Sequence, residues 1–115
     1  MNQTLSTPVE AYVETINTGD LAGLLALFAE DAQVKDAGRE HHGTDAIRHW
    51  AEREIFAVDV TLEVVGRRAH DGEEVITTKV DGTFDRTGLP DPLLIDQHFR
   101  TAGGKITRLE CKLVE

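Results

Sequence analysis

Residues 11–36, AYVETINTGDLAGLLALFAEDAQVKD, decide the fold class because they predict two short helices followed by a strand. The first helix begins near Thr7, where TPVE combines a capping-box pattern with proline at the first helical position. Gly19 marks its end, since glycine readily adopts the left-handed conformation found at helix C-termini. Apolar residues recur at the i, i+3, i+4 and i+7 positions of one helical face: Val9, Tyr12, Val13 and Ile16.

The second predicted helix is capped by Asp20, and a short strand at residues 32–35 then leads to Asp36. The apolar face of this helix consists of Leu21, Leu24, Leu25 and Phe28. After a predicted loop, AGREHHG at residues 37–43, we expect Thr44 to cap a third helix. One face of that helix carries Ile47, Trp50 and Ala51. The first half of the chain is therefore predicted to be mainly helical.

The second half of the chain predicts antiparallel strands. Between residues 58 and 64, Val or Leu alternates with polar residues, which is the period of a half-buried strand. HDGE at residues 70–73 predicts a hairpin turn before a returning strand at residues 75–84. The next segment, DRTGLPDP, is predicted to be a loop because proline cannot sit inside a central strand. Residues 93–101 and 105–114 are predicted to form a last hairpin. Helices followed by a meander of strands indicate one α+β domain with room for a pocket inside a curled sheet.

Composition excludes several classes of function. The chain has 115 residues, enough for a single domain, which we expect to span residues 1–115. Its 12 basic and 21 acidic residues give a formal net charge of −9, which opposes binding to nucleic acid or to anionic membranes. Cys111 is the only cysteine, so neither a disulfide framework nor a cysteine metal cluster is expected. MNQTLSTPVE lacks the pattern of a signal peptide, so we expect a cytoplasmic location.

Three polar residues are candidates for chemistry, although each also has an ordinary structural explanation. Tyr12 lies on the apolar face of the first helix, where a core aromatic residue is common. Asp36 ends a strand before a glycine-containing loop, where aspartate often forms turns. Asp96 lies within an apolar strand and could pair with His98 or Arg100 at a solvated edge. An ionised carboxylate buried without a partner is costly, and such a group usually neutralises instead.

The strand parity around Asp96 is clear from the sequence. Within LLIDQHFRTAGGKI (residues 93–106), Asp96 shares a strand face with Leu94 and His98. The opposite face carries Ile95, Gln97 and Phe99. The adjacent His41 and His42 point apart on any regular element, so we expect no metal site there.

Taken together, these segments resemble the ketosteroid isomerases of the NTF2-like superfamily, which also includes the SnoaL-like polyketide cyclases. Residues 11–36 resemble the opening of those isomerases, and IDQHFRTAGGKI resembles their late strand and hairpin. The resemblance implies an NTF2-like cone-shaped α+β barrel, with three N-terminal helices packed in a curved, mostly antiparallel sheet. Two positions depart from the isomerase pattern: Ala37 stands in place of a proline, and Ala51 in place of a second tyrosine.

The resemblance also implies a mechanism in which a proton moves allylically in a β,γ-unsaturated ketone through a dienolate. Asp36 corresponds to the catalytic base, and Tyr12 to an oxyanion-hole donor. Asp96 corresponds to a second donor, an aspartic acid that stays protonated. We expect the pocket walls to include Trp50, Leu94, Leu109 and Cys111.

No metal or cofactor is implied by this resemblance. The expected partners are an apolar small-molecule ketone or enone and a second copy of the chain, bound through the outer sheet face. Two alternatives stay open: a SnoaL-like polyketide cyclase that performs an aldol condensation, and a non-catalytic protein that binds an apolar ligand.

Overall fold

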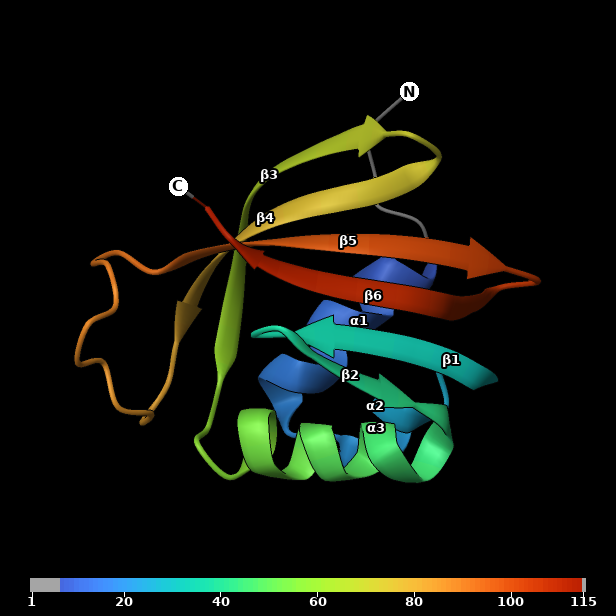
Figure 1. Ribbon diagram of the computed structural model, residues 1–115, viewed down its shortest axis with the longest axis horizontal. Helices are drawn as coiled ribbons and strands as arrows, with labels where there is room; N and C mark the ends of the chain where they lie inside the picture. The colour runs from blue at the N-terminus through green and yellow to red at the C-terminus, as the bar shows by residue number, and fades with distance from the viewer. Residues whose placement is uncertain (1–6, 115) are drawn as a thin grey trace.

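The computed structural model describes residues 7–114, which form three helices, one π-helical turn and one curved sheet (Figure 1). In chain order the elements are α1 (Thr7–Thr18), α2 (Leu21–Leu25), β1 (Phe28–Asp36), β2 (Arg39–His42), α3 (Gly43–Ala51), the π-helical turn η1 (Glu52–Phe56), β3 (Thr61–His70), β4 (Glu73–Asp81), β5 (Leu94–Ala102) and β6 (Lys105–Leu113).

The six strands lie in the order β2-β1-β6-β5-β4-β3. Every neighbouring pair is antiparallel except β1 and β6, which are parallel. The helices pack within the curve of this sheet, with α1 against β3 and β6, and α3 against β1 and β2 (Figure 1). This arrangement confirms the predicted α+β fold with a curved, mostly antiparallel sheet.

Helix α1 has the boundaries and the buried face that its sequence predicts. Val9, Tyr12 and Ile16 are buried in the core, and Gly19 follows the helix with a φ of +74°. The Asn17 side chain then binds the backbone of Leu62 in both directions: its Nδ2 donates to the carbonyl at 2.9 Å and its Oδ1 accepts from the amide at 2.7 Å. This paired contact ties the end of α1 to β3 and so positions Tyr12 relative to the sheet.

The prediction for the second helix was wrong at its C-terminal end. Asp20 caps α2 as expected, accepting a hydrogen bond from the Gly23 amide at 2.9 Å. The helix ends at Leu25, however, and Phe28 begins β1 instead of completing the helical face. The physical reason is strand pairing, because the Ile106 amide donates to the Leu27 carbonyl at 2.8 Å and draws the chain onto β6.

The segment predicted as a loop after Asp36 contains a strand. Ala37 and Gly38 form a tight turn with φ values of +53° and +79°, and β2 pairs with β1 immediately after it. The next prediction, Thr44 as a cap, was wrong, since His42 occupies the N-cap position of α3 and Thr44 lies inside the helix. The turn places Asp36 at the last position of β1, beside the end of the cavity described below.

Candidate active site

A cavity of about 400 Å³ lies between the helices and the inner face of the sheet. Its wall is mostly apolar, and its apolar side chains come from α1, η1, β3, β4, β5 and three connecting segments: Ile16, Ala37, Ile55, Val58, Val60, Leu62, Val80, Phe84, Leu89, Leu93 and Ile95. Polar side chains also line the cavity: Tyr12, Asp36, Trp50, Gln97 and Cys111 lie inside it, and the exposed charged residues Arg53, Glu54 and Asp85 border it. An apolar cavity with a few polar groups is the usual form of a small-molecule site.

Tyr12 is a buried phenol that faces this cavity. It is only 2% exposed, and its ring packs edge-on against Phe99 with 5.0 Å between the ring centroids. Burial raises the pKa of Tyr12 well above its usual value, and the neighbouring Cys111 and Asp36 raise it further. Among residues 7–114, none accepts a hydrogen bond from the hydroxyl. Tyr12 is therefore a neutral donor whose proton is available to a ligand.

Asp36 enters the cavity from the end of β1 and is held there by one hydrogen bond. Trp50 of α3 donates its indole Nε1–H to the Asp36 Oδ2 atom at 3.0 Å. The other oxygen, Oδ1, accepts no hydrogen bond from the described part of the chain, residues 7–114. The turn that follows explains one departure from the isomerase pattern, because proline has a φ fixed near −65° and cannot adopt the +53° of Ala37.

Asp96 does not join these two residues, so the prediction that it shares their cavity was wrong. It lies on the outer face of β5, where Thr77 donates to its Oδ1 at 2.5 Å and Arg68 pairs with its Oδ2 at 3.2 Å. Partial burial alone would raise the pKa of Asp96, but these hydrogen bonds and the charges of Arg68 and His98 bring it below its usual value. Asp96 is therefore an ionised carboxylate at neutral pH, and it is not a protonated donor.

The four predicted wall residues are divided between three environments. Trp50 and Cys111 line the cavity as expected. Leu109 is fully buried in the core but does not reach the cavity surface. Leu94 lies on the outer side of β5 and is absent from the lining, so its assignment was wrong. Burial, together with the Asp36 and Glu110 charges, raises the pKa of the Cys111 thiol well above its usual value, so this residue is a poor nucleophile.

Gln97 is the cavity residue that sequence reasoning missed. It is 3% exposed, and its Nε2 donates to the Thr78 Oγ1 at 3.1 Å. The available signal was its strand face, because Gln97 alternates with Ile95 and Phe99 on the apolar side of β5.

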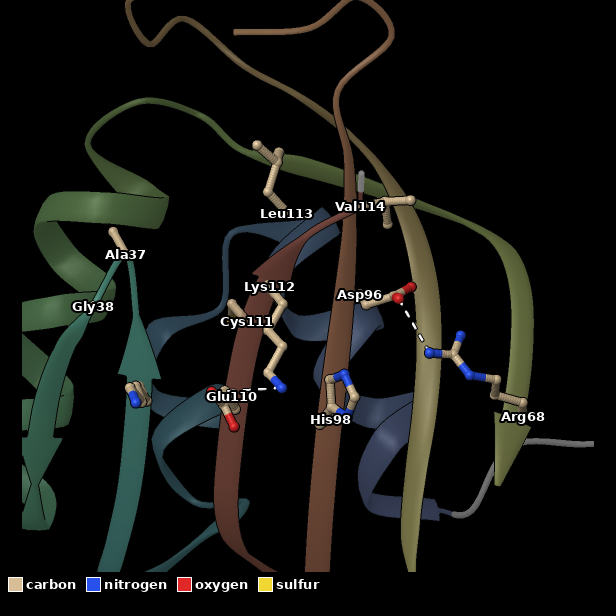
Figure 2. A pocket seen from close by; sticks show the side chains of 11 residues that line it. Ala37, Gly38, Arg68, Asp96, His98, Glu110, Cys111, Lys112, Leu113 and Val114 are labelled. Atoms are coloured by element: carbon tan, nitrogen blue, oxygen red, sulfur yellow. Dashed lines mark hydrogen bonds and ion pairs between the residues drawn. The ribbon is translucent and has the colours of Figure 1, made fainter. Parts of the chain in front are cut away.

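A second, larger concavity of about 740 Å³ lies on the outer face of the sheet. Figure 2 shows two charged pairs among its side chains, Arg68 with Asp96 and Lys112 with Glu110, beside uncharged residues such as Leu113 and Val114. We place the candidate site in the smaller inner cavity because, of the two, only this one combines a mostly apolar wall and a carboxylate with buried donors that bind no acceptor among residues 7–114. No group of three or more His, Cys, Asp or Glu side chains within residues 7–114 is arranged to hold a metal ion. In the same range, no helix is long and apolar enough to cross a membrane.

The fold and the cavity define the class of protein. Helices packed inside a curved sheet, with a small-molecule cavity between them, are the features of an NTF2-like domain. Within that class the chain belongs to the SnoaL-like domain family, whose model matches residues 9–109.

Comparison with solved structures agrees with this assignment. The chain is similar to a candidate polyketide cyclase from Sinorhizobium meliloti, with 28% identity over 94% of this chain and 95% of the other, and a TM-score of 0.83. It has the fold of an NTF2-like protein of unknown function from Cytophaga hutchinsonii, with 10% identity, coverage of 98% and 95%, and a TM-score of 0.74. It also has the fold of the Δ5-3-ketosteroid isomerase from Mycobacterium sp., with 18% identity, coverage of 90% and 88%, and a TM-score of 0.71.

Proposed function

We propose that the chain is an enzyme that moves a proton at the carbon next to the carbonyl group of an apolar ketone. Its first product is an enolate, or a dienolate when the substrate is a β,γ-unsaturated ketone. The observation that carries the proposal is that the partly buried carboxylate of Asp36 lies in the same apolar cavity as the buried phenol of Tyr12, whose hydroxyl donates to no group within residues 7–114. These two groups are the minimum that such a reaction requires, a base for carbon and a donor for oxygen.

The proposed step assigns one role to each residue. The free Oδ1 of Asp36 accepts the proton, and the electrons of the broken C–H bond form a carbon–carbon double bond while the carbonyl oxygen gains charge. The Tyr12 hydroxyl donates a hydrogen bond to that oxygen, and its raised pKa keeps the phenol neutral during the reaction. Asp36 then returns the proton to the γ-carbon, which gives a conjugated enone and restores the carboxylate.

The test replaces Asp36 by Asn, which still accepts the Trp50 hydrogen bond but cannot take up a proton. With 5-androstene-3,17-dione and smaller β,γ-unsaturated ketones as substrates, we expect the rate to fall by about 10²- to 10⁴-fold. Asp31→Asn is the matched control, since Asp31 is an exposed carboxylate on the same strand, and its rate should equal that of wild type. The rate is followed by the ultraviolet absorbance of the conjugated product. If wild-type protein converts none of these ketones, isomerisation is excluded as the activity.

A second candidate function is the aldol cyclisation of a polyketide, which begins with the same enolate. The similarity to the candidate polyketide cyclase at 28% identity favours it. Deuterium exchange tests the first step, which both candidate functions share, independently of what later happens to the enolate. With either function, the wild-type protein should transfer deuterium from D2O to the α-carbon of a bound ketone. The Asp36→Asn variant should not. Binding of the ketone without exchange would leave a non-catalytic binding protein.

We also propose that two copies of the chain associate through the outer face of the sheet. The helices leave this face uncovered (Figure 1), and it carries paired charges of both signs, such as Arg68 with Asp96 and Lys112 with Glu110. A two-fold axis brings the same patch against itself, so a surface with both signs can be self-complementary. Light scattering at low and high salt should give the mass of a dimer for wild type and of a monomer for Arg68→Glu. A wild-type mass of one chain at both salt concentrations contradicts this proposal.

A further inference from the structure

We infer that Gln97 donates a hydrogen bond to the carbonyl oxygen of the ligand, as a second donor beside Tyr12, and that Thr78 fixes its amide in the required orientation. The inference rests on the proposed function only in taking the ligand to be a ketone. The role of second oxyanion-hole donor, which the resemblance implied for a protonated Asp96, is thereby assigned to the neutral amide of Gln97.

The position of Gln97 is the first support for this inference. Its side chain projects from the inner face of β5 into the cavity that contains Tyr12 and Asp36. With only 3% exposure, its amide is removed from bulk water. A primary amide buried in an apolar wall is costly unless each of its hydrogen-bonding groups finds a partner.

The Thr78 hydroxyl determines whether the nitrogen or the oxygen of the Gln97 side-chain amide faces it. Thr78 donates its only hydroxyl proton to the Ile95 carbonyl at 2.9 Å, so its oxygen can only accept from the Gln97 side chain at 3.1 Å. The amide nitrogen of Gln97 must therefore face Thr78, and the amide oxygen lies toward the Cys111 thiol, with a sulfur–oxygen distance of 3.9 Å. Thr78 is fully buried, so its hydroxyl and the hydrogen bond from Gln97 are held in a fixed position.

The second N–H of the Gln97 amide has no hydrogen-bond acceptor among the residues that the structure describes. An amide nitrogen carries two protons, and Thr78 accepts only one of them. No other residue in the range 7–114 accepts a hydrogen bond from this nitrogen. An unpaired buried donor weakens the fold of the free protein, and a ligand carbonyl in the cavity satisfies it. A ketone oxygen has two lone pairs, so it can accept from Gln97 and Tyr12 together.

A ketone and its parent hydrocarbon test this inference directly. 1-Tetralone carries an acceptor and no O–H or N–H donor, whereas tetralin has the same ring skeleton without the oxygen, so the ratio of their affinities measures the donors. We expect wild-type protein to prefer 1-tetralone in calorimetric titrations. Gln97→Met, which keeps length and apolar volume, should reduce that preference by about 3- to 10-fold with tetralin affinity unchanged. The C=O stretching frequency of bound 1-tetralone should rise when the donor is lost.

Two variants at Thr78 test its positioning role, and they keep the inference testable if Gln97→Met fails to fold. Thr78→Val removes the acceptor and should lower the ketone preference and raise the C=O frequency, while Thr78→Ser restores both. A purely structural role of Thr78 would weaken the binding of 1-tetralone and tetralin equally. Equal affinities of wild type for both molecules overturn the inference, as does a ketone preference that persists in Gln97→Met with the same C=O frequency.

The outcomes also separate this inference from the proposed function. If the ketone preference depends on Gln97 but the α-carbon exchanges no deuterium, the donor is real and the enzyme proposal fails. If exchange depends on Asp36 while Gln97→Met has the same ketone preference, the enzyme proposal stands and the inference about Gln97 fails.

Discussion

Replacing Tyr12 by Phe should abolish most of the activity and at the same time stabilise the protein. The substitution removes one hydroxyl and leaves the ring that packs edge-on against Phe99. Within residues 7–114 no group accepts a hydrogen bond from that hydroxyl, although Tyr12 is only 2% exposed. The buried hydroxyl therefore opposes folding of the free protein and finds a hydrogen-bond partner only when a ligand is bound.

Both magnitudes follow from this geometry. Removing one donor to a developing oxyanion costs about 10²- to 10³-fold in kcat. A buried hydroxyl without a partner costs about 1–3 kcal/mol, and part of that is recovered when the group is deleted. We expect the free energy of unfolding to rise by about 1 kcal/mol, which corresponds to an increase of about 4 °C in Tm for a domain of this size.

The burial of Tyr12 also predicts how the free energy of unfolding changes with pH. Because the pKa of Tyr12 is raised in the folded state, the unfolded chain loses this proton first as the pH passes 10.0, the ordinary value for tyrosine. Ionisation of this group therefore leaves the free energy of unfolding unchanged below pH 10 and lowers it above pH 10. Tyr12 is the only tyrosine in the chain, so Tyr12→Phe should remove that part of the decline.

The assay combines thermal unfolding of the free protein with turnover, or deuterium exchange, of the ketone. Phe99→Leu is the control for ring packing, since it should lower Tm without removing the donor. The reasoning is refuted if Tyr12→Phe lowers Tm, because the hydroxyl must then have a hydrogen-bond partner in the free protein. It is also refuted if activity is retained while Tm rises.

Three further predictions concern one residue of the cavity and two outside it. Asp96→Asn should leave kcat/KM for the ketone unchanged, because Asp96 lies outside the cavity; a loss comparable with that of Asp36→Asn contradicts the placement. Burial opposes ionisation of Glu73, but a hydrogen bond with His98 and nearby positive charges lower its pKa below 4.5. Its stabilisation is therefore present above pH 4.5 and lost as the pH falls further, and Glu73→Gln should flatten that part of a denaturation profile measured against pH. Trp50→Phe removes the 3.0 Å hydrogen bond to Asp36, which should lower kcat by about tenfold; an unchanged kcat means that the bond does not position the base.

Much of the fold follows from sequence periodicity because the long elements bury one face each. The apolar residues of α1 lie on one helical face, and those of the late strands lie on one sheet face. Only one orientation of each element removes these residues from water. β2 was missed for the opposite reason: residues 39–42 are four polar or charged residues, with no apolar alternation that predicts a strand. Its pairing depends on the tight turn at Ala37 and on β1 beside it.

The error at Asp96 has a different cause. Similarity along the chain placed an acid at this position, but a shift of one residue in a strand moves a side chain to the opposite face. Strand parity already grouped Gln97 with Ile95 and Phe99, which are apolar and face the helices. Parity is therefore a better guide to the cavity than residue type, because the curve of the sheet decides which face is enclosed.

The carboxylates and hydrogen-bond donors that line the cavity favour some reactions over others. Hydrolysis of a glycosidic bond requires two carboxylates on opposite sides of the substrate. Here Asp36 is the one carboxylate joined by a hydrogen bond to a buried side chain of the cavity, while Glu54 and Asp85 are exposed where they border it. The groups that accompany Asp36 inside are neutral donors, the Tyr12 hydroxyl and the Gln97 amide. In the proposed roles, the base takes the proton from carbon and the two neutral donors stabilise the anion that forms on oxygen, so this combination favours enolate chemistry over attack by water.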